Sequence, residues 1–169
     1  MFLQGLFQEL ADRFALRMRG TPLARQAGAI PYTVVKGQAV FLLVTSRRTG
    51  RWIFPKGELS EAMQPWEIAA HEAFEEAGVK GEIETQPIGS YRTMKTSGIR
   101  RYPIVVDLYP LRVTEQFEEW PEKNQRHRHW AILPEAKRLL SEPRLKELAA
   151  LLSRRLMAET QPTTAHMIQ

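Results

Sequence analysis

The chain has 169 residues, which suits one domain large enough to bury a hydrophobic core. Hydrophobic residues make up 43% and charged residues 25% of it, ordinary values for a globular protein, and no apolar run approaches the ~20 residues that span a bilayer. Cysteine is absent, which excludes disulfides and cysteine-based zinc sites and favours a reducing, cytoplasmic location.

The net charge is +5, from 24 Lys and Arg against 19 Asp and Glu, and suits a polyphosphate, nucleic acid or an anionic surface as partner. The arginines form small groups and no long basic block, which favours a pocket for a compact anion over a tail lying along DNA. The groups are Arg47, Arg48 and Arg51; Arg100 and Arg101; and Arg126 and Arg128. Each arginine taken alone is equally well explained as solubilising surface charge.

Residues 1–20 are expected to form an N-terminal amphipathic helix, because apolar residues recur there at spacings of three and four. These residues are Leu3, Leu6, Phe7, Leu10 and Phe14. Acidic side chains interrupt the segment, which argues against a signal or transit peptide. We expect the helix to pack on the domain or on a partner subunit, so a homodimer stays open; attachment to a membrane surface is the lesser alternative.

The main domain is expected over residues 21–158, followed by a flexible tail over residues 159–169. Strands are predicted at 27–35, 39–45 and 51–54, and again, after a central helix, at about 88–94, 102–114 and 129–133. Residues 114–126 are polar and predict a loop, and two helices, near 135–140 and 144–157, close the domain. Strands around a central helix, with further helices, predict an α/β fold with a mixed sheet.

The central helix is predicted from Pro65, a favourable first helical residue, to Ala77, before the helix-terminating Gly78. Its 100° per residue places Glu72, Glu75 and Glu76 on one face. Two carboxylates about 6 Å apart repel by roughly 3 kcal/mol at an effective dielectric of about 20.

Such crowded carboxylates have two explanations. On an open surface they form a solvated acidic stripe, the usual meaning of this pattern when it stands alone. In a cleft, a divalent cation relieves the repulsion, and oxygen ligands favour Mg²⁺ or Mn²⁺.

The surrounding residues resemble the Nudix box, which runs Gly, five residues, Glu, seven residues, Arg-Glu-apolar-x-Glu-Glu-x-Gly-apolar. Gly57 matches the opening glycine, and the closing half is matched without a gap by Glu72, Ala73, Glu75, Glu76, Gly78 and Val79. Two positions depart from the box. Met63 stands in place of the first Glu, which argues for fewer metals or a weaker enzyme. His71 stands in place of the Arg that helps to orient the neighbouring glutamate in that family.

Flanking segments are similar to the diphosphoinositol polyphosphate phosphohydrolase branch of that family. They run from Phe41 to Arg47, from Arg51 to Pro55, and from Glu118 through Trp120 to Trp130. The resemblance covers about residues 25–152 and implies the Nudix-type α/β/α sandwich, with a mixed sheet and a central catalytic helix.

The resemblance also implies roles for single residues. The Gly57 carbonyl, Glu72 and Glu76 would hold the metal, and Glu75 would complete this set or act as base on the attacking water. Family members differ in which glutamate is the base, so Glu72 and Glu75 both stay candidates. Phosphate-binding side chains are expected at Arg25, Arg47, Lys56, Arg101, Arg126 and Arg128, since guanidinium groups bind phosphate bidentately.

The leading hypothesis is a Mg²⁺-dependent (or Mn²⁺-dependent) pyrophosphohydrolase that acts on a diphosphoinositol polyphosphate or a dinucleoside polyphosphate. A second hypothesis changes the substrate to a nucleotide sugar, a nucleoside triphosphate or a 5′-triphosphate RNA end, with Tyr32, Tyr91 and Trp120 as candidates to stack on a base. A third is a degenerate domain that binds nucleotide or protein without turnover. Apart from an RNA end, neither nucleic acid nor a membrane is expected as partner.

Overall fold

The structure is a computed structural model that describes residues 23–160. The helix expected over residues 1–20 and all but two residues of the expected tail lie outside the described residues. Within residues 23–160, no helix is both long and apolar enough to cross a membrane.

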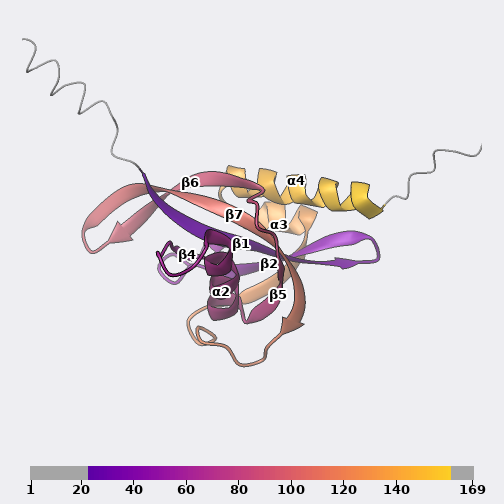
Figure 1. Cartoon of the computed structure of the whole chain (residues 1–169), viewed down its shortest axis with the longest axis horizontal. Helices are drawn as coiled ribbons and strands as arrows, with labels where there is room; N and C mark the ends of the chain where they lie inside the picture. Colours follow the sequence, from indigo (N-terminus) through magenta and orange to yellow (C-terminus); the bar gives the residue numbers. More distant parts are fainter. Residues whose placement is uncertain (1–22, 161–169) are drawn as a thin grey trace, which may run out of the picture.

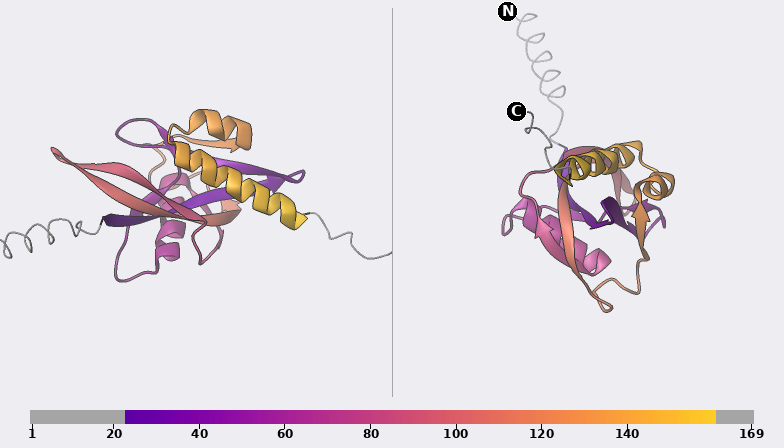
Figure 2. Two further views of the ribbon diagram at one scale, coloured as in Figure 1. Left: turned by 90° about the horizontal axis from the view of Figure 1, so that it is seen from above. Right: turned by 90° about the vertical axis from the view of Figure 1, so that its right-hand side faces the viewer.

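The described residues form an eight-stranded sheet between helices on two faces (Figures 1 and 2). The strands are β1 (Ala24–Val35), β2 (Gln38–Thr45), β3 (Trp52–Ile53), β4 (Lys56–Glu58), β5 (Val79–Ile83), β6 (Gly89–Ser97), β7 (Arg100–Gln116) and β8 (Arg128–Ile132). The helices are α2 (Pro65–Ala77), α3 (Leu133–Leu139) and α4 (Pro143–Thr160). Helix α2 covers one face of the sheet, and α3 and α4 lie on the other (Figure 2).

The sheet is mixed, which confirms the predicted fold class. Its main path is β3-β2-β1-β7-β5, while β4 pairs with β1, β6 with β7 and β8 with β2. The central pair β1 and β7 is parallel, and the other pairs are antiparallel. Because helices cover both faces, β1 is buried continuously from Gln26 to Tyr32 instead of alternating between buried and exposed residues.

Two hydrophobic cores follow from the alternation of side chains along β2. Phe41 and Leu43 point into the core under α3 and α4, while Leu42 and Val44 point into the core under α2. In the second core, small side chains of α2, including Ala69 and Ala73, pack beside small side chains of β1. These small contacts let α2 approach the sheet closely, which brings its acidic face near β4.

Helix α2 has the predicted bounds. Pro65 occupies its first turn, and the Gln64 backbone N–H donates a hydrogen bond to Glu67 Oε2 at 2.8 Å. Gly78 ends the helix in the left-handed region, at φ 66°.

Strands β4 and β5 were not predicted. Strand β4 has only three residues, and β5 carries mainly exposed residues along the border strand of the sheet path, so neither has the hydrophobic pattern of a buried strand. Strands β6 and β7 are longer than predicted, because they pair as a hairpin that extends past the helices (Figure 2). Helix α4 continues to Thr160, two residues beyond the expected domain end at residue 158.

Candidate active site

The acidic face of α2 meets the backbone of β4 at Gly57. Strand β4 pairs with β1 at this point, with Gly57 opposite Ala27. A Cβ atom added to Gly57 would overlap the carboxylate of Glu72, so a larger residue there would force the Glu72 side chain to move. The opening glycine of the box and the glutamate fifteen residues after it thus lie against each other.

Glu76 lies deepest of the three glutamates, with 5% of its surface exposed. Its Oε2 accepts a hydrogen bond from the Lys56 backbone N–H at 3.3 Å, and its Oε1 accepts one from Arg126 Nη2 at 2.6 Å. Burial raises the pKa of the Glu76 carboxyl to about 7, and the charges of Arg126 and Lys56 oppose this increase.

Glu72 and Glu75 lie closer to the solvent, beside His71. One potential ligand atom from each of these three side chains lies within 4.8 Å of the others. Burial and then the charge of Glu75 raise the pKa of Glu72, as expected for a carboxylate placed near a like charge. A divalent cation fits this arrangement, because it would relieve the repulsion and the Gly57 backbone lies against the Glu72 carboxylate.

The two departures from the box lie on the accessible side of the site. The side chain of His71 is half exposed, and its Nε2 is 3.7 Å from Glu75 Oε1, beyond a normal hydrogen bond. Met63 is 37% exposed.

A cavity of about 330 Å³ adjoins the buried glutamate, since Lys56 and Arg126 both line it and both bond to Glu76. Its lining residues come from strands β1, β3, β4, β6 and β7, the loop after β2, the loop before β8, the segment between α3 and α4, and α4 itself. The charged ones are Arg47, Arg48, Arg51, Lys56, Lys95, Arg126 and Glu142. This surplus of cations matches an anionic ligand.

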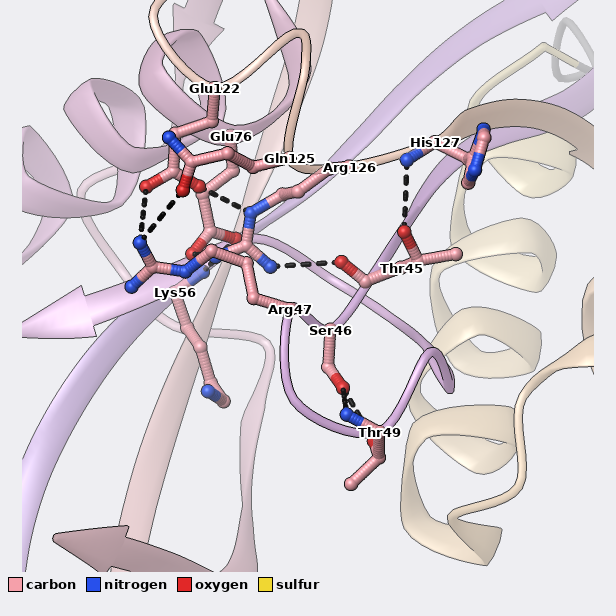
Figure 3. A network of polar contacts seen from close by, with 10 residues as sticks. All are labelled: Thr45, Ser46, Arg47, Thr49, Lys56, Glu76, Glu122, Gln125, Arg126 and His127. Atoms are coloured by element: carbon pink, nitrogen blue, oxygen red, sulfur yellow. Dashed lines mark hydrogen bonds and ion pairs between the residues drawn. The ribbon is translucent and has the colours of Figure 1, made fainter. Parts of the chain in front are cut away.

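The loop from Ser46 to Arg51 is held by its own hydrogen bonds. The Ser46 N–H donates to the Arg51 carbonyl at 2.8 Å, and the Gly50 N–H donates to the Ser46 carbonyl at 2.9 Å. The hydroxyls of Ser46 and Thr49 also bond to each other (Figure 3). This closed turn presents its arginines along one wall of the cavity.

Of the six predicted phosphate-binding residues, Arg47, Lys56 and Arg126 line the cavity. Figure 3 shows the Lys56 side chain extending away from the Glu76–Arg126 pair. Arg47 is mostly exposed, donates a hydrogen bond to Gln125 at 3.1 Å and lies 3.5 Å from Glu122. Arg126 is buried, and its guanidinium group donates hydrogen bonds to Glu122, the Thr45 carbonyl and Glu76.

The other three, Arg25, Arg101 and Arg128, are absent from the described lining of this cavity. Arg25 forms a bidentate ion pair with Asp107 at 2.6 and 2.7 Å, and Arg101 is exposed in the β6–β7 hairpin.

Arg128 binds the end of the catalytic helix. Its Nη1 donates to the carbonyls of Ala77 at 3.0 Å and Phe117 at 2.8 Å, and its Cζ lies 4.0 Å from the centre of the Trp120 ring. These contacts satisfy a free carbonyl at the C-terminus of α2 and place a positive charge where the helix dipole favours it.

Three cavity cations, Arg48, Arg51 and Lys95, were not among the predicted site residues. Arg48 and Arg51 share a loop with Arg47, so their grouping was an available signal. Lys95 comes from β6, where nothing in the neighbouring sequence indicates that it lies near the loop after β2. Lys95 also forms an ion pair with Glu58, which joins the β6–β7 hairpin to β4.

The aromatic residues considered for base stacking are largely covered by the protein. Tyr32 and Tyr91 are buried in the core under α3 and α4, and Tyr91 also forms part of the cavity lining. Trp120 is covered by Arg128, and its ring lies against Gly78. These three rings therefore pack within the protein in this structure.

The pairing of a glutamate-bearing helix with the Gly57 turn is matched by a comparison with family models. The model of the NUDIX domain matches residues 22–152, which is most of the chain. The chain belongs to the Nudix family. The predicted membership and the Nudix-type fold are thus confirmed, as is the prediction of a pyrophosphohydrolase.

Curated relatives include plant and animal Nudix hydrolases. The chain is 33% identical over 141 residues to Nudix hydrolase 21, chloroplastic, from Arabidopsis thaliana, covering 78% of this chain and 68% of the relative. It is 30% identical over 118 residues to diphosphoinositol polyphosphate phosphohydrolase 3-beta from Bos taurus, and the match covers 69% of this chain and 68% of the relative. The chain spans 63% of another relative, Nudix hydrolase 12, mitochondrial, from Arabidopsis thaliana. The predicted resemblance to the diphosphoinositol branch is confirmed.

Solved structures share the fold at lower sequence identity. A binary complex of C. elegans Ap4A hydrolase superposes with a TM-score of 0.61 at 20% identity, covering 80% of this Nudix chain and 99% of that one. The NUDIX domain of Shewanella oneidensis NrtR, complexed with ADP ribose, superposes with a TM-score of 0.62 at 16% identity. The match covers 82% of this chain and 92% of the NrtR chain.

Proposed function

We propose that this Nudix hydrolase depends on Mg²⁺ or Mn²⁺ and cleaves a diphosphate bond in a densely phosphorylated small molecule. Diphosphoinositol polyphosphates and dinucleoside polyphosphates are the proposed substrates. The observation that carries this proposal is the charge of the cavity beside Glu76, which five Lys and Arg side chains line in addition to the buried Arg126. A substrate with many phosphates could contact several of these cations at once, whereas a substrate with few phosphates would contact fewer of them.

The metal would be held by the Gly57 carbonyl, Glu72, Glu75 and Glu76. When bound, a divalent cation neutralises charge on the phosphoryl oxygens and lowers the pKa of coordinated water. The chain's own contribution is to hold Glu72 close to Glu75 against their repulsion, with the Glu72 carboxylate against the Gly57 backbone of β4.

The proton of the attacking water goes to a carboxylate of the pair Glu72 and Glu75. As the water oxygen forms its bond to phosphorus, the phosphoanhydride P–O bond breaks, and the leaving phosphate keeps the electron pair. Both carboxylates lie on the accessible side of the site, and burial raises the pKa of Glu72 toward the range of a useful base. Arg47, Arg48, Arg51, Lys56 and Lys95 are proposed to bind the remaining phosphates.

The names of two similar proteins support this class of substrate. One relative is a diphosphoinositol polyphosphate phosphohydrolase, and one structure with the same fold is an Ap4A hydrolase. The ADP-ribose complex of the NrtR domain represents the alternative, a substrate with a single diphosphate.

A panel of substrates tests the proposal. Turnover is measured by chromatography of the products with Mg²⁺ and with Mn²⁺. The substrates are a diphosphoinositol polyphosphate, diadenosine tetraphosphate, ADP-ribose, a nucleotide sugar, a nucleoside triphosphate and a 5′-triphosphate RNA. We expect the highest kcat/KM with the first two, and loss of turnover when a chelator removes the metal. Higher kcat/KM for ADP-ribose would contradict the substrate class. Binding of these compounds without any turnover would support a degenerate binding domain instead.

A further inference from the structure

Arg126 is held on three sides by three different parts of the fold. Its Nη2 donates to Glu76 Oε1 on α2 at 2.6 Å, and its Nη1 donates to the Thr45 carbonyl at the end of β2 at 2.9 Å. Its Nε donates to Glu122 Oε2 in the loop before β8. Figure 3 shows Arg126 among these partners. Only 6% of its side chain is exposed. The guanidinium group is therefore fixed in position before any ligand arrives.

The loop that carries Arg126 is itself attached to α2. The Glu122 N–H donates to the Glu75 carbonyl at 3.1 Å, and the Arg126 N–H donates to the Glu122 carbonyl at 3.1 Å. Glu122 thus joins α2 through its backbone and Arg126 through its side chain. Helix α2 therefore contacts the loop at Glu122, the loop residue Glu122 contacts Arg126, and Arg126 in turn contacts Glu76 on the same helix.

A substrate-gripping role would require Arg126 to leave these contacts at least in part. Glu76 would then be a buried carboxylate without its cation, which is strongly unfavourable. Arg47 is different, because it is exposed at the same end of the cavity and has only looser contacts to Gln125 and Glu122. Arg126 is thus buried and held by several hydrogen bonds, whereas Arg47 is exposed and more loosely held.

We propose that Arg126 is a positioning residue, which holds the Glu76 carboxylate in place for the metal and does not bind substrate phosphate. This inference rests on the proposed function, in which Glu76 is a metal ligand. It also accounts for His71. The box arginine is replaced there by a half-exposed histidine 3.7 Å from Glu75, and Glu76 is instead oriented from the loop before β8.

The test begins with the binding of Mn²⁺ without substrate, followed by electron paramagnetic resonance. If Arg126 positions Glu76, Arg126→Gln weakens Mn²⁺ binding by roughly 10–100-fold, the range found when a group that orients a metal ligand is removed. If Arg126 were only a nearby positive charge, its removal would strengthen the binding of a cation. The two explanations therefore predict opposite signs. Arg51→Gln is the matched control, a cavity arginine without a contact to Glu76 among those described, and should not weaken Mn²⁺ binding.

The second part is a comparison of kcat and KM for a diphosphoinositol polyphosphate and for ADP-ribose. A positioning residue acts on the reaction centre, so Arg126→Gln should lower kcat by the same factor for both substrates and leave the ratio of their KM values unchanged. Arg126→Lys should recover part of the Mn²⁺ affinity and of kcat. An increase in KM confined to the polyphosphate, with Mn²⁺ affinity unchanged or stronger, would overturn the proposal.

A double mutant shows whether Arg126 acts through Glu76. Once Glu76→Gln has removed the carboxylate, adding Arg126→Gln should cause no further loss of Mn²⁺ affinity. A second loss of full size would overturn the proposal.

Glu122→Gln covers the case in which Arg126→Gln does not fold, because it removes one contact of Arg126 and leaves the Glu76 pair intact. It should weaken Mn²⁺ binding in the same direction by a smaller factor. Unchanged Mn²⁺ affinity in both Glu122→Gln and Arg126→Lys would overturn the proposal. Weaker Mn²⁺ binding in these variants, with no turnover of any diphosphate by the unaltered protein, would refute the proposed function and leave the positioning role standing.

Discussion

The acidic face of α2 and the cation-lined cavity beside it are built in different ways. The acidic face and its glycine partner come from a continuous run of 22 residues, Gly57–Gly78, in which helical periodicity alone places the carboxylates together. The cavity takes its charged wall from segments between Arg47 and Glu142, which tertiary packing brings together. The proposed metal-binding residues are thus encoded locally, whereas the cavity proposed to bind the substrate is not.

The two regions also carry opposite charge and meet at Glu76. Its two oxygens bond to Lys56 and Arg126, both of which line the cavity. This boundary suggests that the two regions have separate roles: the acidic face of α2 determines turnover, and the Lys and Arg side chains of the cavity, the basic wall, determine substrate affinity. The variants below test these separate roles.

The largest effect is expected for Glu76→Gln. The amide keeps the shape of the side chain but removes a charged oxygen ligand, so kcat should fall by at least about a hundredfold for every substrate, since the metal contributes several kcal/mol to the reaction. Turnover with Mg²⁺ measures this loss. An unchanged thermal unfolding midpoint is the check that the fold persists, and turnover within tenfold of the unaltered protein would refute the assignment of Glu76.

Gly57→Ala should have the next largest effect, because the new Cβ would overlap the Glu72 carboxylate. Displacement of that carboxylate should lower kcat by about 10–100-fold, the cost of disturbing the geometry of a metal ligand. Gly37→Ala is the matched control. It strains a turn at φ 77° but meets no atom within 4 Å, so it should reduce stability without lowering kcat. Equal losses of kcat in both variants would mean that stability, and not the site, explains the result.

The basic wall is tested by Arg51→Ala beside Arg101→Ala. Arg51 lines the cavity, whereas Arg101 lies on the β6–β7 hairpin and is not among the described lining residues. Loss of one charge-assisted contact, about 1.5 kcal/mol, should raise KM for the polyphosphate by roughly tenfold in Arg51→Ala, with kcat nearly unchanged. Arg101→Ala should leave KM within twofold. The reverse order of the two KM values would show that the hairpin, and not the cavity, binds the phosphates.

The difference between a locally encoded helix face and a cavity assembled by tertiary packing also explains which parts could be predicted from sequence. The bounds of α2 were predicted because Pro65 and Gly78 mark its ends and its alanines mark its packed side. The resemblance to the Nudix box implied that Gly57 and Glu72 belong to one site. Strands β4 and β5 could not be predicted, because a three-residue strand and an exposed border strand have too few buried residues to show a period.

The roles of single arginines depend on contacts far apart in the sequence. Arg126 and Arg128 are two residues apart in one basic cluster, yet Arg126 bonds to Glu76 and Arg128 binds the carbonyl of Ala77. Strand β8 and the loop before it determine this difference, because they place the two side chains at different points along α2. The resemblance to the diphosphoinositol branch implied one shared role, phosphate binding, for both.

The smallest effect is expected for His71→Arg, which restores the box residue. A half-exposed residue at position 71 lies beside Glu75, while the Glu76 carboxylate is already bonded to Arg126 and to the Lys56 backbone. The new arginine should therefore change kcat and Mn²⁺ affinity by less than about twofold, as an exposed ion pair contributes little. The same substitution in the Arg126→Lys background should have a larger effect, because the orientation of Glu76 is then incomplete. A large gain from His71→Arg alone would mean that the acidic face still lacks an orienting cation, and that the loop before β8 does not supply it.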